Sequence, residues 1–598
     1  MNPDRTDLPV ETMPRLCMVG WYDPAQLFRT GIQVVVSTLF GRHSDARRLD
    51  TLSSKPPIID YRHEKYLDDA GCFGFDYVAD TGDGWNSTYA VAYAVSQQHC
   101  APSNHPPLPR GTLLVMGGDL VYPYPTRQLY ENRLVAPYSV AGQLHNDEPV
   151  EVLAIPGNHD WYDSLVNFRR LFCCQRMMGF RQTRQTRSYF AASLPANWWL
   201  FGVDVQLDGD LDESQFKFFS DVVSELGHDQ RVILCMPEPV WHERWQRDES
   251  AFHCGTLLEH LEKDIGDKLK VCIAGDLHHY QRYSTADNQH RITCGTGGAF
   301  LHPTHQIPSD PTSEFNHQRS FPDQEKSRRL SFLNLGFLAR NPLFGIVPAI
   351  AYLLAGWQNG FAVGQCFGQR CIKEVGSLGL SQWTEAVYAG VNSALLTPAG
   401  FAIYVLIFWG FVFFADRRSK KFCYCFGTVH AAAHIAAGFM VFWFAAYAAI
   451  TWAGLAPKSV TQYLLSGAIM FILGWIVGSL LLGVYLLASL NLFGMHRNDA
   501  FSSLRIEDWK GFLRCKIDAD GRLRIRFIGF EKVPRKWETA VIGGRKILRP
   551  AREEDFVGEV IDEIDIPGGT ARISAKASPR GAKPPRLTKS AVSESVEV

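Results

Sequence analysis

Three short polar motifs each follow an apolar run that has the composition of a buried strand. They read GGDLVYP at 117–123, PGNHDWY at 156–162 and AGDLHHY at 274–280. Each motif places Asp, Asn or His just past the predicted strand, where α/β folds build ligand sites from loops. Because carboxylate, amide and imidazole groups are metal ligands, this spacing predicts a metal centre at one end of a sheet.

Five motifs in sequence order resemble those of the calcineurin-like metallophosphoesterase superfamily. The sequence has ADTGD (79–83), GGD (117–119), GNHD (157–160), CMPEP (235–239) and GDLH (275–278). The family order is Asp-x-His, Gly-Asp, Gly-Asn-His-Asp, a lone His after a strand, and Gly-His-x-His. The resemblance implies an α/β fold, a layered β-sandwich flanked by helices. It also implies hydrolysis of a phosphoester by a hydroxide that bridges two divalent metal ions.

The resemblance further implies which residues hold the metals. Asp80 and His278 would bind the first metal, Asn158 would bind the second, and Asp119 would bridge both. Asp276 stands where the family has a histidine and would bind the second metal through oxygen. This oxygen-rich set of ligands favours Mn, Fe or Mg ions over Zn.

The sequence departs from the family pattern at two further positions. Gly82 replaces the first histidine, and Asp83 either supplies the missing metal ligand or is only a turn residue. Pro237 replaces the lone histidine and has no side-chain ligand atom, and Glu238 follows it on the predicted strand. Four histidines could compensate, or could instead lie outside the site: His242, His279, His302 and His305.

Two pairs of residues are expected to act on the substrate. The resemblance implies that His159 is a general acid or charge stabiliser and that Asp160 orients it. Arg127 and Arg133 follow the GGDLVYP motif, and a guanidinium group suits phosphate oxygens. The alternative for both arginines is an ordinary surface position.

Longer stretches resemble a subgroup of large, multi-span membrane-bound metallophosphoesterases seen in bacteria and plants. They include FDYVADTGDGWNSTYAVA from residue 75, GGDLVYPYPT from residue 117 and AFSSLRIEDWKGFLR from residue 500. The resemblance implies that ADTGD and GDLHH are regular forms of a working site. The fourth motif usually reads His-Glu-Pro there, so Pro237 is a departure that puts full activity in question.

Composition narrows the class of protein. The chain has 598 residues, enough for several domains, and a net charge of −1, which gives no bias toward nucleic acid. Its 14 cysteines lack the spacing of a disulfide framework, and the first residues lack the pattern of a secretory signal. We therefore expect free thiols in a reducing compartment.

Long stretches without Asp, Glu, Lys or Arg lie between residues 341 and 496. Each is longer than the roughly 20 residues that cross a bilayer as a helix. They predict four membrane-spanning helices near 342–362, 394–415, 430–452 and 463–489. Lys and Arg are concentrated before the first predicted span, between the second and third, and after the fourth, which predicts that both ends face the cytoplasm.

These patterns predict six segments along the chain. They are an irregular N-terminal segment at 1–70, the metallophosphoesterase domain at 71–305, a linker at 306–340, the four-helix transmembrane region at 341–494, a small β-rich domain at 495–567 and a disordered basic tail at 568–598. The β-rich domain is expected because apolar and polar residues alternate around an Asp-Gly turn at 520–521.

The sequence favours a membrane-anchored, metal-dependent phosphoesterase whose partners are a phosphoester substrate and the lipid bilayer. Two alternatives remain open. A catalytically impaired scaffold or sensor would explain Pro237, and a transporter or channel with a regulatory soluble domain would explain the spans. The substrate and the oligomeric state are not encoded in any motif.

Overall fold

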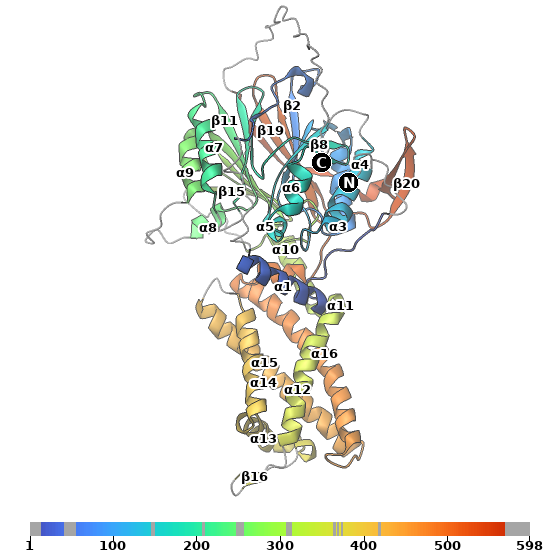
Figure 1. Cartoon of the computed structure of the whole chain (residues 1–598). Coiled ribbons are helices and arrows are strands. Elements are labelled where there is room, and N and C mark those ends of the chain that lie inside the picture. Colours follow the sequence, from blue (N-terminus) through green and yellow to red (C-terminus); the bar gives the residue numbers. More distant parts are fainter. Residues whose placement is uncertain are drawn as a thin grey trace, which may run out of the picture.

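The computed structural model of the chain has two parts, a body of two β-sheets and a bundle of long helices (Figure 1). The structure describes residues 13–40, 55–144, 150–205, 210–246, 256–306, 314–362, 366–367, 370–371, 375–416 and 420–568. The predicted basic tail falls outside these residues, apart from its first position.

The first sheet has eight strands. Their order across the sheet is β1 (Ile59–Asp60), β9 (Phe190–Leu194), β10 (Trp198–Gly202), β11 (Arg231–Met236), β12 (Leu269–Ala274), β14 (His290–Cys294), β13 (Tyr280–Ser284) and β15 (Asn316–Phe321). The strands β10, β11, β12 and β14 are parallel, so their carboxyl ends lie at one edge of the sheet.

The second sheet also has eight strands. Their order is β22 (Glu559–Ile566), β19 (Leu523–Phe530), β18 (Lys510–Ile517), β2 (Phe73–Val78), β5 (Leu113–Gly117), β6 (Val150–Ile155), β8 (Arg181–Thr183) and β7 (Met177–Met178). The strands β2, β5, β6 and β8 are parallel to one another, and β18 runs antiparallel to β2.

Alternating apolar side chains fill the space between the two sheets. Phe75, Val115 and Leu153 point inward from the second sheet and meet Ile233 and Ile273 from the first, all fully buried. This alternation is the pattern of a two-sheet sandwich, in which every second side chain of each strand faces the partner sheet. The main core of the body therefore lies between the sheets.

Helices cover the two outer faces of the sandwich (Figure 1). The second sheet packs against α2 (Trp85–Ser96), α4 (Ala136–Gly142) and α6 (Val166–Phe172), and the first against α7 (Glu213–Ser224) and α9 (Leu257–Ile265). Shorter elements are α3 (Arg127–Leu129), α5 (Asn158–Trp161), α8 (Trp241–Gln246), β3 (His99–Cys100) and β4 (Leu108–Pro109). The prediction of an α/β fold with flanking helices is confirmed.

The C-terminal strands differ in placement from the prediction. A separate β-rich domain was expected at 495–567, but β18, β19 and β22 extend the second sheet beyond β2. Of the described C-terminal strands, only β20 (Trp537–Ile542) and β21 (Arg545–Pro550) form a separate two-stranded sheet. The reason is that alternation marks a strand with one buried face but does not name its partner strand.

The segment predicted as a linker at 306–340 is also structured where it is described. It supplies the edge strand β15 of the first sheet, followed by α10 (Gln324–Ser331) and α11 (Phe337–Arg340). The polar, proline-containing sequence that suggested a linker fits an edge strand, whose outer face is open to solvent.

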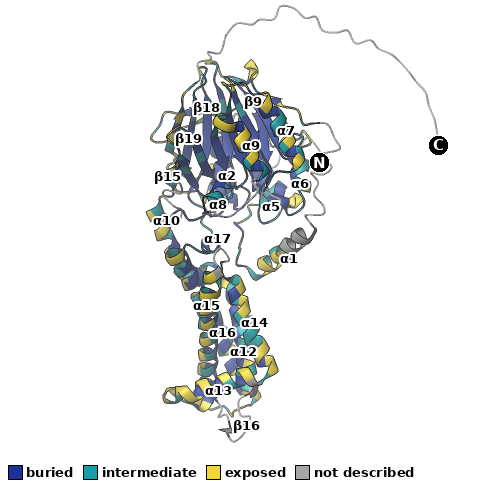
Figure 2. Ribbon diagram, turned by 90° about the vertical axis from the view of Figure 1, so that its left-hand side faces the viewer, coloured by how far each residue is buried: buried dark blue, intermediate teal, exposed yellow. Residues whose placement is uncertain are grey.

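Five helices make up the lower part of the molecule. They are α12 (Ile346–Ala362), α13 (Trp383–Leu396), α14 (Pro398–Phe414), α15 (Lys420–Tyr447) and α16 (Val460–Phe493), with a short hairpin of β16 (Cys366–Phe367) and β17 (Arg370–Cys371) at the far end. Figure 2 shows exposed residues along these helices, and they include Leu354 (47% exposed) and Leu464 (67% exposed). Exposed apolar faces of this extent suit contact with lipid.

Two of the helical stretches are long and apolar enough to cross a membrane alone, at Lys421–Trp452 and Val460–Phe493. Two bent pairs pass the same test only when each pair is taken together. In the first, Gln324–Arg340 and Pro342–Gly360 meet at 64°, and in the second, Leu380–Leu395 and Pro398–Phe414 meet at 96°. The described residues therefore offer two to four candidate spans.

The sheets and the helices meet through a layer of short segments that contains α1 (Pro24–Phe40) and α17 (Arg497–Ser502) (Figure 1). The ring of Tyr22 packs edge-on against Phe337 and Phe344, with centroids 5.0 and 5.4 Å away. Its hydroxyl donates a hydrogen bond to the carbonyl of Asp499 at 3.1 Å. The N-terminal segment thus connects the sandwich to the helical bundle.

Candidate metal centre

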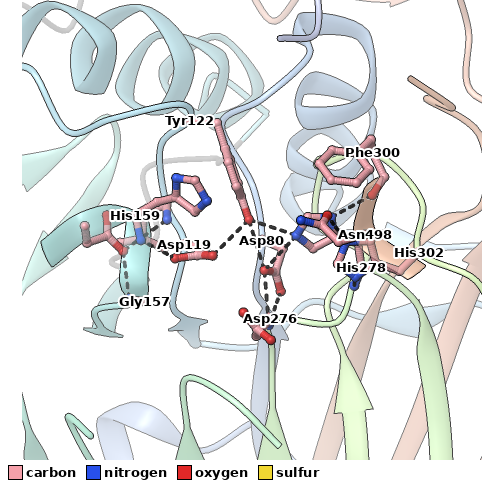
Figure 3. Close-up of polar contacts among 12 residues, drawn as sticks. Asp80, Asp119, Tyr122, Gly157, His159, Asp276, His278, Phe300, His302 and Asn498 are labelled. Carbon is pink, nitrogen blue, oxygen red and sulfur yellow. Dashed lines mark hydrogen bonds and ion pairs between the residues drawn. The ribbon is translucent and has the colours of Figure 1, made fainter. Parts of the chain in front are cut away.

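Loops from both sheets bring the predicted polar residues to one end of the sandwich (Figure 3). Asp80 follows β2, Asp119 follows β5 and Asn158 follows β6, all in the second sheet. Asp276 and His278 follow β12 in the first sheet. The backbone N–H of Asp276 donates to both carboxylate oxygens of Asp80, at 3.1 and 2.9 Å, which links the two sheets at this point.

The backbone at these strand ends takes an uncommon conformation. Asp80, Asp119 and Asp276 have φ angles of 57°, 51° and 67°, in the left-handed region that few residues other than glycine adopt. A Cβ atom on Gly157 would overlap Asp119, and one on Gly295 would lie 2.5 Å from Asp80 Oδ2. Backbone strain and close approach at three converging acids are features of ligand sites.

The hydroxyl of Tyr122 lies at the centre of the cluster. Its oxygen is 3.1 Å from Asp80 Oδ1, 3.1 Å from Asp119 Oδ2 and 3.0 Å from His278 Nε2. His278 Nδ1–H donates to the carbonyl of Phe300 at 2.8 Å, so Nε2 is the unprotonated nitrogen. A phenol has one proton and therefore can donate to only one of these three acceptors.

Burial raises the electrostatic cost of this arrangement. It raises the pKa of Asp80 to about 8. Burial, followed by the nearby charges of Asp80, Asp160 and Asp276, raises the pKa of Asp119 well above its usual range. Burial also lowers the pKa of His278 to about 3, which keeps the imidazole neutral. Without a cation these shifts favour protonated carboxyl groups beside a neutral imidazole, and a bound cation would favour the carboxylates instead.

The donor groups fit a divalent cation. Two carboxylates, a neutral imidazole and a phenol converge on one point, and such an oxygen-rich set suits Mn, Mg or Fe. In the part of the chain that the structure describes, no three His, Cys, Asp or Glu side chains are arranged by themselves to hold a metal ion, and the Tyr122 oxygen contacts two of the carboxylates and the imidazole. The sequence motifs did not single out Tyr122, although it follows Asp119 by three residues in GGDLVYP.

Donors for a second cation lie beside Asp119. Asn158 borders the same cavity as Asp276, and its Oδ1 is buried with no hydrogen-bond partner among the described residues. A buried amide oxygen without a partner is costly and fits a missing ligand. Pro237 is buried next to this loop, since a Cβ on Gly118 would lie 3.2 Å from Pro237 Cβ.

The histidines considered as substitutes have other surroundings. His302 stacks on His278 with ring centroids 4.0 Å apart and pairs with Asn498 at 3.1 Å. His305 pairs with the hydroxyl of Ser327. The remaining two do not contact the Tyr122 hydroxyl: His242 packs against the rings of Trp245 and Tyr283, and His279 is buried. Glu238 is half-buried.

The hydrogen bonds of Asp160 differ from the expectation that this carboxylate orients His159. The ring of His159 borders the cavity, and its Nδ1–H donates to the carbonyl of Pro123 at 2.8 Å. Asp160 accepts instead from the backbone N–H of Gly157 at 2.9 Å and of Leu120 at 3.2 Å. Asp160 therefore ties two site loops together, and a carbonyl orients His159. Burial lowers the pKa of His159 to about 4.

Three predicted residues lie outside the cluster. Asp83 accepts from the backbone N–H of Val19 at 2.7 Å and lies 3.9 Å from Arg133. Arg133 is half-buried and donates to the carbonyls of Asp83 and Cys17. Arg127 is exposed at the start of α3 and does not line the cavity beside the acids. Asp83 and Arg133 thus hold the N-terminal segment in place.

Comparison with known proteins gives weak matches. No protein-family model matches the chain, and no curated protein matches it. A purple acid phosphatase from yellow lupin (Lupinus luteus) seeds matches with 12% identity and a TM-score of 0.30, over 43% of this chain and 49% of that one. The match thus spans about half the length of the lupin protein.

Two further solved structures match to a similar degree. GAP50 of the Plasmodium inner membrane complex matches with 13% identity and a TM-score of 0.29, over 41% of this chain and 78% of that one. A dimetal phosphatase from Danio rerio matches with 13% identity and a TM-score of 0.24, over 41% of this chain and 91% of that one. The case for a function therefore rests on the acid cluster itself.

Proposed function

We propose that the chain is a metal-dependent phosphoesterase anchored to a membrane by its apolar helices. One observation carries the proposal: Asp80, Asp119 and His278, from three loops of two sheets, converge on a single oxygen atom, that of Tyr122. The order of the motifs that supply these side chains is that of the calcineurin-like metallophosphoesterases.

The charge of the cavity supports the need for cations. The cavity beside the cluster has a volume of about 700 Å³ and is bordered by Asp119, Asp276 and Asp499. Among the described residues that line it there is no Lys or Arg. A phosphate group would meet only negative and neutral side chains there, so its binding needs metal ions.

We assign one cation to Asp80, Asp119, His278 and Tyr122, and a second to Asp119 with Asn158 and Asp276. Bound metals supply charge stabilisation and an activated water. The protein itself orients the metal-binding groups. The carbonyl of Phe300 accepts from His278 Nδ1–H and so leaves Nε2 free to bind a metal, and the loop backbones position the carboxylates.

His159 is the side chain placed to handle a proton. Because Pro123 holds Nδ1–H, the other nitrogen, Nε2, is the one that can exchange a proton with a bound phosphoester. The ring is neutral in the free protein because burial lowers its pKa to about 4. A nearby phosphate dianion raises that pKa, so His159 gains a proton together with the substrate and can donate to the leaving oxygen.

The direct test compares Asp119→Asn and Asn158→Ala with Asp60→Asn, a half-exposed surface carboxylate that serves as the matched control. The purified full chain is assayed with Mn²⁺ against generic phosphomonoesters and phosphodiesters. Turnover should fall by about a hundredfold or more in the first two variants. Equal turnover in Asp119→Asn and Asp60→Asn would contradict the proposal.

Pro237 favours a second candidate, a catalytically impaired relative that binds one metal and serves as a scaffold. Elemental analysis of the wild type beside Pro237→His tests this, with Pro239→His, two residues further on, as the control. A rise from one metal equivalent to two, with turnover appearing only in Pro237→His, would favour the scaffold for the natural chain. Two equivalents in the wild type would favour the enzyme.

We also propose four spans with both ends in the cytoplasm. The bent pairs supply the two spans that no single helix provides, and the basic residues outside the predicted spans support the orientation. Accessibility of single cysteines placed in the α12–α13 segment and in the sandwich would test it.

A further inference from the structure

The cavity beside the acid cluster does not end at the sandwich. At one end it is lined by Asp119 and Asn158. At the other end it is lined by Val347 of α12 and by Leu406 and Gly410 of α14, within the helical bundle. One continuous space of about 700 Å³ thus joins a polar site to apolar helices, and this volume is that of a ligand pocket.

Aromatic side chains surround the middle of the cavity. The ring of Trp21 lies 5.7 Å from the ring of His159 and 6.2 Å from that of Phe300. Tyr22 and Phe344 pack edge-on just beyond, and all five rings border the space. Aromatic rings of this kind are common where a polar environment changes to an apolar one.

Exposed side chains line the apolar end of the cavity. Val347 of α12 and Leu406 of α14 are 46% and 72% exposed. Leu27 of α1 lines it too and is 44% exposed. The apolar end of the cavity would therefore lie at bilayer depth, beside exposed side chains, if α12 and α14 span the membrane.

We propose that the substrate is an amphiphilic phosphoester that enters from the bilayer. Its phosphate lies at Asp119 and Asn158, and its hydrocarbon chain lies between α12 and α14. This inference rests on the proposed phosphoesterase function, which it narrows to one class of substrate. A small water-soluble phosphoester would leave the apolar end of the cavity unfilled, whereas a lipid chain matches its lining in polarity.

A side chain that fills the apolar end provides the test. Nothing lies within 4 Å of a Cβ built on Gly410, so Gly410→Trp adds bulk to open space without forcing the backbone to move. Ala402→Trp is the matched control, because Ala402 is exposed on the same helix and does not line the cavity. Both variants and the wild type are studied as full chains in lipid nanodiscs, with melting temperature as a check of folding.

The first readout is substrate selectivity. Ethyl phosphate and dodecyl phosphate carry the same reacting group and differ only in chain length. We expect Gly410→Trp to lower the ratio of kcat/KM for dodecyl to ethyl phosphate by about tenfold or more, the effect of unburying about two methylene groups. The ratio in Ala402→Trp should stay within about twofold of the wild type. An unchanged ratio in Gly410→Trp would overturn the inference.

The second readout needs no turnover. Dodecylphosphonate, which cannot be hydrolysed at the P–C bond, is titrated into each protein and its binding measured by native mass spectrometry. The apolar site is supported if dodecylphosphonate binds to the wild type and to Ala402→Trp but not to Gly410→Trp. If this binding pattern is seen and no phosphoester is hydrolysed, only the proposed function fails. Hydrolysis with equal selectivity in all three proteins keeps the function and overturns the lipid site.

Discussion

At the scale of single residues, Tyr122 is the most informative side chain. Its hydroxyl lies at 3.0–3.1 Å from three acceptors, and it has one proton to give. Asp80 Oδ1 also accepts from the backbone N–H of Asp276 at 3.1 Å, but the single phenol proton cannot serve both Asp119 Oδ2 and His278 Nε2, and a cation would satisfy both. The Tyr122 oxygen therefore marks the position where a bound cation would be stabilised.

We predict that Tyr122→Phe weakens Mn²⁺ binding by about ten- to a hundredfold, the usual effect of losing a group that directs a metal site. Isothermal titration of the metal-free protein would measure it. Tyr77→Phe is the control, because that hydroxyl is also buried but has no hydrogen-bond partner among the described residues. Equal Mn²⁺ affinity in the two variants would remove Tyr122 from the site.

Lys510 is a second residue with an unusual charge state. It is fully buried at the start of β18, its ammonium group donates to the carbonyl of Asp508 at 2.9 Å, and its charge lowers the pKa of Asp80. Burial lowers the pKa of Lys510 to about 7, although Asp508 and Asp83 raise it. At neutral pH the chain thus holds a half-protonated amine near its acids.

The pH dependence of stability follows from this shift. The pKa of Lys510 is about 7 in the folded protein and 10.5 in the unfolded chain. Above pH 10.5 the amine is neutral in both states, so its burial costs no stability. As the pH falls from 10.5 toward 7, only the unfolded chain takes up the proton, and the folded protein becomes less stable. We predict that Lys510→Met removes this loss, up to about 5 kcal/mol at roughly 1.4 kcal/mol per pKa unit. Melting temperatures of the metal-free protein between pH 7 and pH 10 would show it. Profiles that stay parallel to the wild type would refute it.

At the scale of elements, the join between β2 and β18 holds the site in place. Arg514 on β18 donates to both oxygens of Asp76 on β2, at 2.8 and 3.2 Å, and to the carbonyl of Leu108 at 2.9 Å. Both charged side chains are buried. Asp80 follows β2 directly, so the position of that acid depends on a strand from the far end of the chain.

Arg514→Met should destabilise the protein by about 3–5 kcal/mol, because it leaves the carboxylate of Asp76 buried without its partner. The control is Arg522→Met, which removes an ion pair with Asp565 whose side chains are 41% and 47% exposed. That change should cost no more than about 1 kcal/mol. Chemical unfolding in detergent would compare the two, and equal costs would show that the join is not a major source of stability.

Sequence patterns predicted the convergence of acids because the relevant signal is local. Asp80, Asp119, Asn158 and Asp276 each follow an apolar run, and parallel strands bring such residues to one edge. For Arg133 the sequence left two positions open, beside a substrate phosphate or on the surface. Its position next to the GGDLVYP motif does not reveal that the backbone carbonyls of Asp83 and Cys17 bind its guanidinium.

Features that depend on distant segments could not be predicted from sequence patterns. From the sequence, Tyr122 has the pattern of an ordinary buried core residue. Its role becomes visible only when the loops that carry Asp80 and His278 are placed beside its hydroxyl. Alternation over 510–530 indicates strands but not that β18 would pair with β2. Apolar length predicted α12 and α14, whereas the 64° and 96° bends beside them depend on packing within the bundle.

At the scale of the whole molecule, the sandwich is incomplete without residues on both sides of the helical bundle. The two flanking segments lie close together, since Asn491 donates to Ser331 at 2.9 Å and Ser503 to Asn334 at 2.9 Å. The chain therefore enters the helical bundle and comes back from it at the same place beside the sandwich.

We predict that a fragment of residues 55–330 does not fold, because β2 would be an exposed edge and Asp76 would lose Arg514. The matched control joins residues 55–330 to residues 504–568 through a flexible glycine–serine linker, which the short distance between the two ends permits. That protein should be monomeric and folded by gel filtration and circular dichroism. A folded 55–330 fragment would contradict this view of the domain.

The pairing of β2 with β18 also determines when the second sheet can be completed during synthesis of the chain. Asp76 and Arg514 are 438 positions apart, so tens of seconds pass on the ribosome between the synthesis of one and that of the other. All the candidate spans found among the described residues are made in that interval. A nascent chain can therefore complete the strand order around its acids only after all of these candidate spans have been made, so a partly synthesised chain lacks the finished acid cluster.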